Sequence, residues 1–244
     1  MSNINEGMAS IESTRNIRNL SHELFSNELN VDPISSHPFE TPKARARIME
    51  LITKGINEKG TIVFVDADMD NLKHLNDSLG HAKTNEAIKK VIDEKNKAVE
   101  GLEESGYFLL WRPQAGGDEF RILFVFTETN DLEESINKVK QALKPETNFE
   151  GKKITCSFGM IVKQLNGHEN PGEVLQEMEQ VAERKQMEEK MKKINKRLEE
   201  ILKVAETSSP DEFIKGVSEA LGSTRIGKEG LERLLKTVYL MGKE

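Results

Sequence analysis

Short apolar runs alternate along the chain with stretches in which apolar residues recur every three or four positions. The runs are rich in β-branched and aromatic residues, as strands are, and they cover residues 61–65, 107–111, 120–126 and 153–162. The three-to-four spacing predicts helices over about 10–29, 42–60, 83–100, 131–143 and from 171 onward. This mixture predicts an α+β sandwich, with a sheet covered by helices on one or both faces.

Composition divides the chain into three regions. Residues 1–31 are polar with one apolar stripe and predict an N-terminal amphipathic helix. All predicted strands fall within 32–185. From Met187 to Ala205 apolar residues step by threes and fours, as in a heptad repeat, but out of phase with the preceding helix. We therefore expect a domain border near 185 and a C-terminal helical extension over 186–244.

The overall composition excludes several classes of protein. There are 42 acidic and 35 basic residues, a net charge of −7, so general binding of nucleic acid is not expected. The one cysteine rules out an internal disulfide and a metal site made of several thiolates. No apolar stretch approaches 18 residues, and the first ten residues lack the order of a signal peptide. We expect a soluble cytoplasmic protein without a membrane partner.

Acidic residues gather at two strand ends. Asp66, Asp68 and Asp70 follow the apolar run 61–65, and Asp118-Glu119 follow the pair Gly116-Gly117, which favours a tight hairpin. Neighbouring carboxylates repel one another, and a bound cation would relieve this repulsion; their oxygens suit Mg²⁺. If the two strands are neighbours, Asp68 and Asp118 would share ions, as in two-metal phosphoryl transfer. The alternative is that both groups are solvated acids at strand ends.

The acids belong to longer motifs that resemble one known family. Residues 116–120, GGDEF, are the signature of the GGDEF domain, the diguanylate cyclase family, and residues 68–77 resemble its D-x-D-x-x-K-x-x-N-D motif. Residues 157–159 resemble its S-x-G strand, and residues 32–35, DPIS, resemble its opening D-P-L-T. The resemblance covers about 32–185. It implies a polymerase- or cyclase-like palm: a central antiparallel sheet flanked by helices, here with an N-terminal helix and a C-terminal helical tail.

The resemblance also implies a metal site. In this family two protomers face each other, and the 3′-hydroxyl of each nucleoside triphosphate attacks the α-phosphate of the other. Asp68 and Asp118 would bind two Mg²⁺ ions, with Mn²⁺ as an alternative, and the carbonyl of Met69 would assist. Glu119 would lie at the metals and help to deprotonate or orient the attacking hydroxyl. A homodimer is therefore the expected partner state.

Nucleotide contacts are implied in the same way. Lys73 would hold the triphosphate, as a point charge suited to phosphate. Asn76 would contact the base and ribose. The remaining expected nucleotide-binding positions are Asn85, Gly116, Gly117 and Lys185.

Departures from the family pattern leave the base open. The family has an acid at the position of Asn85, where it accepts from the guanine edge; asparagine offers one acceptor and one donor, and also matches adenine. Arg112 lies four residues before the glycine pair instead of two, which predicts a wider hairpin. Residues 105–111 contain no R-x-x-D inhibitory product site. Asp66 has no family counterpart, and we expect either a third acid near the metals or an exposed strand end.

Three functions follow as hypotheses. The first is a Mg²⁺-dependent nucleotidyltransferase that condenses two nucleoside triphosphates, by default GTP, into a cyclic dinucleotide, by default cyclic di-GMP. The second is a cyclase with adenine or mixed-base specificity, akin to CRISPR-associated polymerases that make cyclic oligoadenylate. The third is an inactive nucleotide-binding signalling module, against which the intact metal acids argue.

Overall fold

The computed structural model describes residues 32–100, 106–114, 117–127 and 132–205. The helix expected over 10–29 and the part of the expected C-terminal helical extension beyond 205 lie outside these residues. The chain divides into two compact units, one with residues up to Asp70 and Asn85–Gln186, the other with Asn71–Thr84 and residues from Met187 onward. The first unit contains the sheet.

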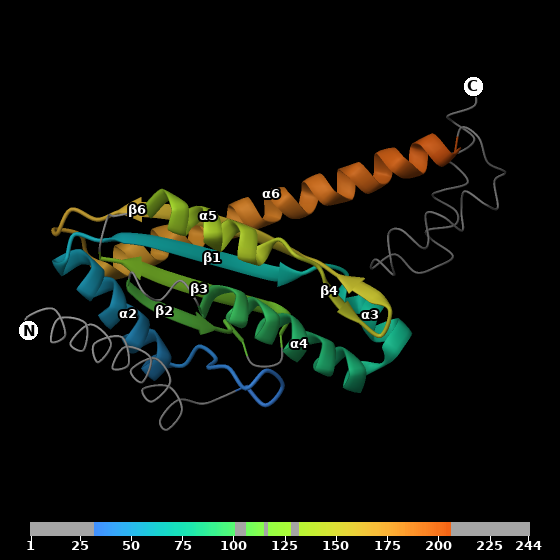
Figure 1. Cartoon of the computed structure of the whole chain (residues 1–244), viewed down its shortest axis with the longest axis horizontal. Helices are drawn as coiled ribbons and strands as arrows, with labels where there is room; N and C mark the ends of the chain where they lie inside the picture. Colours follow the sequence, from blue (N-terminus) through green and yellow to red (C-terminus); the bar gives the residue numbers. More distant parts are fainter. Residues whose placement is uncertain (1–31, 101–105, 115–116, 128–131, 206–244) are drawn as a thin grey trace, which may run out of the picture. The chain divides into compact units, whose positions relative to one another are not determined.

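Four antiparallel strands form the central sheet, in the order β2-β3-β1-β6 (Figure 1). They are β1 (Thr61–Met69), β2 (Gly106–Trp111), β3 (Glu119–Phe126) and β6 (Cys156–Gln164). A separate two-stranded ladder joins β4 (Thr147–Phe149) to β5 (Lys152–Ile154). Every residue of β1 is buried, as expected for a strand with neighbours on both sides. The expected central antiparallel sheet is confirmed.

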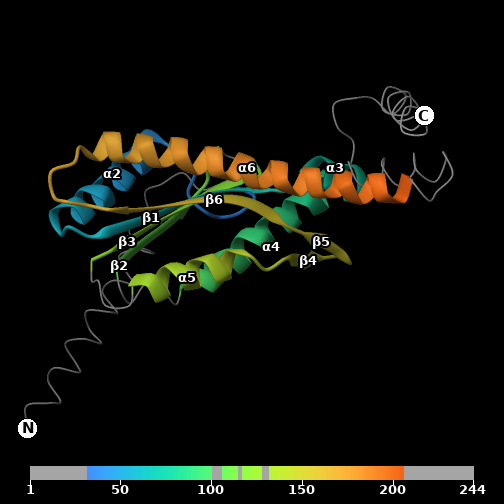
Figure 2. The ribbon, with the colours of Figure 1, turned by 90° about the horizontal axis from the view of Figure 1, so that it is seen from above.

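Helices cover both faces of this sheet. In Figure 2, α2 (Pro42–Asn57) and α6 (Pro171–Ala205) lie on one face, while α4 (His81–Glu100) and α5 (Leu132–Leu143) lie on the other. The hydroxyl of Thr41 accepts from the amide of Ala44, and Pro42 occupies the first turn, so α2 begins where the sequence predicts. The second unit contains α3 (Leu72–Leu79), which begins after Asn71 in a left-handed conformation and ends at Gly80.

The main core lies between the sheet and the α2/α6 layer. Ile62 and Phe64 of β1 point into it, and Phe64 meets the fully buried Trp111 edge to face at 5.8 Å. Residues two apart on a strand share a face, so Asp66 and Asp68 lie on this same face, farther along β1. The apolar residues of β1 therefore pack into the core, and the last residues of the strand carry the acids.

Several expected element boundaries were wrong. The strand 61–65 continues to Met69, so that the acids lie within it. The expected strand 153–162 is two strands, β5 and β6, separated at Thr155, whose carbonyl and hydroxyl both bind Asp70. Seven residues, 112–118, join β2 to β3, so the tight hairpin is wrong and the wider connection is correct. The helix α6 continues through residues 183–186, in agreement with the helix expected from 171 onward.

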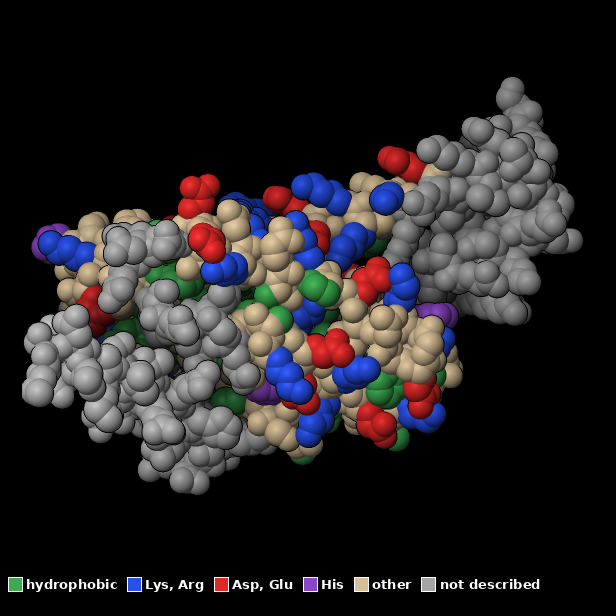
Figure 3. Space-filling view, viewed as in Figure 1, with side chains coloured by type: hydrophobic (Ala, Val, Ile, Leu, Met, Phe, Trp, Pro, Cys, Tyr) green, Lys and Arg blue, Asp and Glu red, His purple; other side chains and the backbone are tan. Residues whose placement is uncertain are grey.

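The described surface is polar. None of the helices within the described ranges is long and apolar enough to cross a membrane. In the face drawn in Figure 3, acidic and basic side chains are interleaved. Ion pairs near the surface link Lys163 of β6 to Glu177 of α6, and Lys193 to Glu189 within α6.

Candidate functional site

The two acidic motifs meet because β1 and β3 are neighbours. Asp68 and Glu119 are directly opposite each other in the antiparallel register. One residue on, the amide of Met69 donates to the carbonyl of Asp118 over 3.3 Å. Side chains of directly opposed residues lie about 4.5–5.5 Å apart at Cβ. The fold thus brings Asp68, Met69, Asp118 and Glu119 to one sheet edge from positions fifty residues apart in the sequence.

Electrostatic repulsion is concentrated at this edge. Asp68 is buried, whereas Glu119 is the more exposed of the pair. Partial burial raises the pKa of Glu119, and the negative charges of Asp66, Asp68 and Asp118 raise it further. A positive ion bound among these carboxylates would offset both the burial of the Glu119 charge and its repulsion by the other acids.

The donor set fits Mg²⁺. Carboxylate and carbonyl oxygens are the hard ligands that this ion prefers. Among the described residues, no three histidine, cysteine or acidic side chains already converge in the geometry of a bound ion. Mg²⁺ sites seldom have such a cage, because the ion keeps waters and takes substrate phosphates alongside one or two carboxylates. That role needs only oxygen ligands, which Asp68, Asp118, Glu119 and the carbonyl of Met69 can supply.

Asp70, the second acid of the D-x-D motif, makes hydrogen bonds within the protein. Its carboxylate accepts from the hydroxyl of Thr155 at 2.5 Å and from that of Ser157 at 2.6 Å, and its amide donates to the carbonyl of Thr155 at 2.8 Å. These bonds hold the end of β1 against β6. Ser157 of the S-x-G motif therefore fixes the strand end that carries Asp68.

The glycine of the same S-x-G motif, Gly159, is required by the close approach of α6 to β6. A Cβ atom here would lie 1.8 Å from the carbonyl oxygen of Ala182 and 2.6 Å from the amide of Gln186. The backbone of α6 thus approaches that of β6 too closely for any side chain. The adjacent Lys185 donates through Nζ to the carbonyl of Met160 at 3.0 Å. This is where the structure places the lysine expected to bind triphosphate.

The other expected nucleotide residues come from α3, α4 and the connection between β2 and β3. Lys73 and Asn76 lie on α3 in the second compact unit. Asn85 is exposed on the first turns of α4, next to the buried Thr84. Gly117 lies in the connection between β2 and β3, and Gly116 falls outside the described residues.

Two largely buried ion pairs were missed from the sequence. Arg112, whose role was left open, is fully buried and donates to Asp32 at 2.6 Å. Asp66 is buried and paired with Arg121 at 2.9 Å, so the exposed-strand-end hypothesis for it is wrong. Burial raises the pKa of Asp66, and Arg121 opposes that rise. The sequence signal was a charged residue inside or directly after an apolar strand, but its partner could not be read from spacing.

Comparison with known proteins gives a consistent result. The family model "Diguanylate cyclase, GGDEF domain" matches residues 44–193. The probable diguanylate cyclase DgcJ of Escherichia coli (strain K12) is 30% identical over 129 residues, which are 52% of this chain and 23% of that protein. The chain therefore spans less than a quarter of the length of this curated relative.

Two solved structures are similar to parts of this chain. One is SiaD from Pseudomonas aeruginosa in complex with its activator SiaC, at 18% identity, with 77% of this chain and 68% of that chain covered and a TM-score of 0.49. The other is the coiled coil and GGDEF domain of DgcB from Caulobacter crescentus in complex with c-di-GMP, at 14% identity, 73% and 89% coverage and a TM-score of 0.46. Because the family model matches more than half of the residues, the chain belongs to the family of diguanylate cyclase GGDEF domains.

Proposed function

We propose that this chain is a Mg²⁺-dependent nucleotidyltransferase that condenses two nucleoside triphosphates, by default GTP, into a cyclic dinucleotide. Family membership supports the reaction class. The observation that carries the proposal is the register of β1 and β3, which sets Asp68 opposite Glu119 and joins Met69 to Asp118. A domain that only bound nucleotide would have no use for this concentration of repelling acids.

Mg²⁺ would be held by Asp68, Asp118, Glu119 and the carbonyl of Met69, with Mn²⁺ as an alternative ion. Bound there, two such ions would neutralise the phosphate charge and lower the pKa of the attacking hydroxyl. The acidic edge would otherwise repel a triphosphate, so metal and substrate are expected to bind together.

Glu119 is the proposed proton acceptor. It follows Asp118 in the chain and lies directly opposite Asp68 in the β1–β3 register, beside the proposed metal acids. The oxygen of the 3′-hydroxyl forms a bond to the α-phosphorus of the second nucleotide, its proton passes to Glu119, and the bond to pyrophosphate breaks. Two such transfers yield one cyclic dinucleotide and two pyrophosphates. Each protomer of a homodimer would present one nucleotide to the other.

Lys73 and Lys185 are proposed to bind the triphosphate. Asn76 is proposed to contact the base and ribose, and Gly116 and Gly117 to lie beside the nucleotide. We place the reaction in the cytoplasm, which supplies nucleoside triphosphates. The exposed position of Lys185 leaves it accessible to an anion, since its one bond within the described residues is to a backbone carbonyl.

Turnover of defined nucleotides tests the proposal directly. The full chain would be incubated with Mg²⁺ and each nucleoside triphosphate singly and in pairs, and the products resolved by mass. A cyclic dinucleotide is expected, and Asp118→Ala should abolish it while the exposed Glu134→Ala on α5 should not. No cyclic product from any pair would favour the binding module instead, and cyclic oligoadenylate would favour the polymerase-like alternative.

The base preference is a separate question, decided at Asn85. An asparagine accepts only part of the guanine edge, so GTP is expected to be used with less preference over ATP than in a site that carries the family acid. Asn85→Asp should shift the ratio of GTP to ATP turnover toward GTP. An unchanged ratio would show that Asn85 does not contact the base.

A further inference from the structure

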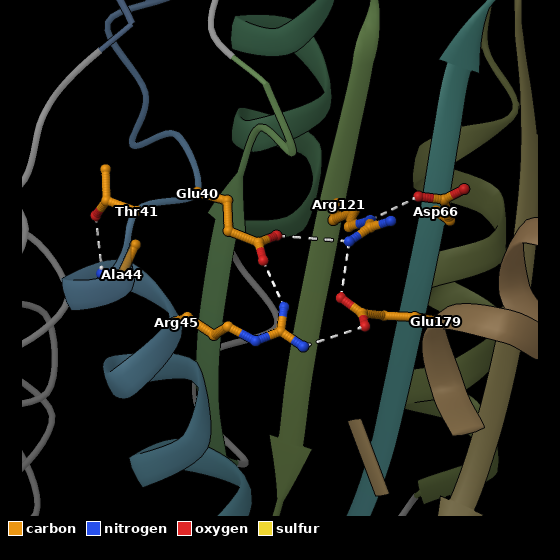
Figure 4. A network of polar contacts seen from close by, with 7 residues as sticks. All are labelled: Glu40, Thr41, Ala44, Arg45, Asp66, Arg121 and Glu179. Atoms are coloured by element: carbon orange, nitrogen blue, oxygen red, sulfur yellow. Dashed lines mark hydrogen bonds and ion pairs between the residues drawn. The ribbon is translucent and has the colours of Figure 1, made fainter. Parts of the chain in front are cut away.

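Arg121 lies at the centre of a network of charges that the family motif does not contain. Its Nε atom donates to Asp66 on β1 at 2.9 Å, and its Nη1 atom donates to Glu179 on α6 at 2.8 Å. Figure 4 shows the guanidinium between these two carboxylates. Glu40, just before α2, lies 3.6 Å from the same Nη1 atom. Arg121 is 16% exposed and Asp66 11%, so this pair is largely withdrawn from water.

A second arginine completes the network from α2. Arg45 donates to Glu40 at 2.5 Å and lies 3.6 Å from Glu179. The network therefore joins the segment before α2, the two central strands and α6 around one guanidinium. Arg45 is 47% exposed, so the strongest contacts are those that Arg121 makes with Asp66 and Glu179.

The Asp66–Arg121 pair lies directly beside the proposed metal acids. Asp66 is opposite Arg121 in the register, and Asp68 is opposite Glu119 two residues along both strands. All four side chains share one face of the sheet, and the two cross-strand pairs are about 7 Å apart along the strands. An unpaired Asp66 would be a fourth negative charge at the same edge.

We propose that Arg121 is a positioning residue of the cyclase site, which turns Asp66 away from the metals and cancels its charge, so that Asp68, Asp118 and Glu119 alone face the cation. This rests on the proposed metal role of those acids. In this arrangement Asp66 is not a metal ligand. It affects the charge at the site only through its ion pair with Arg121. The pair acts as a fixed dipole behind the acids, held in direction by Glu179.

Two single substitutions distinguish charge from mere stabilisation because they change the local charge in opposite senses. Arg121→Gln leaves Asp66 without its counter-charge, so Mn²⁺ should bind more tightly. Asp66→Asn keeps the shape of the side chain but removes one negative charge beside Arg121, which keeps only Glu179 and Glu40 as partners, so Mn²⁺ should bind more weakly. A unit charge about 7 Å away at an effective dielectric near 20 should change the affinity at least about tenfold in each case.

The measurement is Mn²⁺ binding to the full chain without nucleotide, followed by electron paramagnetic resonance of the free ion. Asp66→Asn combined with Arg121→Gln should restore the wild-type affinity, and Arg121→Lys should preserve it. Shifts in the same direction, shifts within about twofold, or no measurable binding to the wild-type chain would overturn the proposal. Retention of Mn²⁺ by Asp118→Ala would do so too, because the ion would then lie elsewhere.

This assay separates the two proposals. Opposite shifts in affinity without any cyclic product from the wild-type chain would retain the role of Arg121 and reject the cyclase function. A cyclic product with unshifted Mn²⁺ affinities would do the reverse. If Arg121→Gln fails to fold, as judged by circular dichroism, the double variant decides the question: recovery of the affinity lost in Asp66→Asn supports the role of Arg121, and an affinity as weak as that of Asp66→Asn overturns it.

Discussion

Replacement of Asp32 by asparagine should destabilise the domain more than any surface change. Asp32 and Arg112 are both 0% exposed, and one carboxylate oxygen of Asp32 accepts from the Arg112 guanidinium at 2.6 Å and from the amide and hydroxyl of Ser35 at 2.7 Å each. The substituted asparagine would keep the volume and the acceptor oxygen but lose the charge. The guanidinium would then be buried without a counter-ion.

The magnitude follows from the burial. Removal of one partner of a buried ion pair costs about 3–5 kcal/mol. Arg112 has little else to compensate, because its Nε and Nη2 atoms find no hydrogen-bond acceptor in the part of the chain that the structure describes. For a domain of this size the melting temperature falls by about 2–4 °C per kcal/mol, so a decrease of about 6–20 °C is expected.

Urea and thermal unfolding, followed by circular dichroism, measure this effect. Lys138→Gln is the matched control: it removes an exposed pair with Glu134 and should cost less than about 0.5 kcal/mol. The double variant Asp32→Asn/Arg112→Met should recover much of the loss, because no charge is then left buried. An Asp32→Asn protein that unfolds together with the Lys138→Gln control would refute the reasoning.

Two further predictions concern packing and pH. Gly159→Ala should cost about 1–3 kcal/mol or more, because its Cβ would lie 1.8 Å from the Ala182 carbonyl, whereas Gly172→Ala should be close to neutral; equal melting temperatures would contradict this. Burial lowers the pKa of His37 below 6.5, although Asp93 at 3.5 Å opposes this shift. Below pH 6.5 the unfolded chain therefore binds more protons than the folded protein, and the free energy of unfolding falls as the pH falls. His37→Gln should flatten this loss in unfolding measured from about pH 7.5 to about pH 5, and an unchanged slope would exclude His37 as its source.

Local patterns were enough to predict most of the elements. The periodicity of α2 and its start at Thr41-Pro42 depend on neighbouring residues only, and so does the apolar run that became β1. The GGDEF signature and the D-x-D motif named the acids that the β1–β3 register brings together. These features are local in the sequence or carried by short motifs, and both kinds of signal can be read without a fold.

Long-range pairing could not be predicted in the same way. Arg112 finds Asp32 across 80 residues, and Arg121 finds Asp66 and Glu179 across 55 and 58. Nothing in the spacing of a charged residue inside an apolar strand shows which opposite charge will face it. The break at Thr155 was hidden for the same reason, since it depends on Asp70, 85 residues away.

These separations also bear on the order in which the domain folds. Contacts between distant residues must overcome the entropy of closing long loops before they return any energy, whereas helices such as α2 and α5 form from neighbours. The connection that carries Asp118 is bound at one end to Pro38 and Glu40 through the backbone of Arg112, and at the other to Met69. We therefore expect the acidic edge to reach its final geometry late, so that a partly folded chain contains helices but cannot yet gather the carboxylates around a cation.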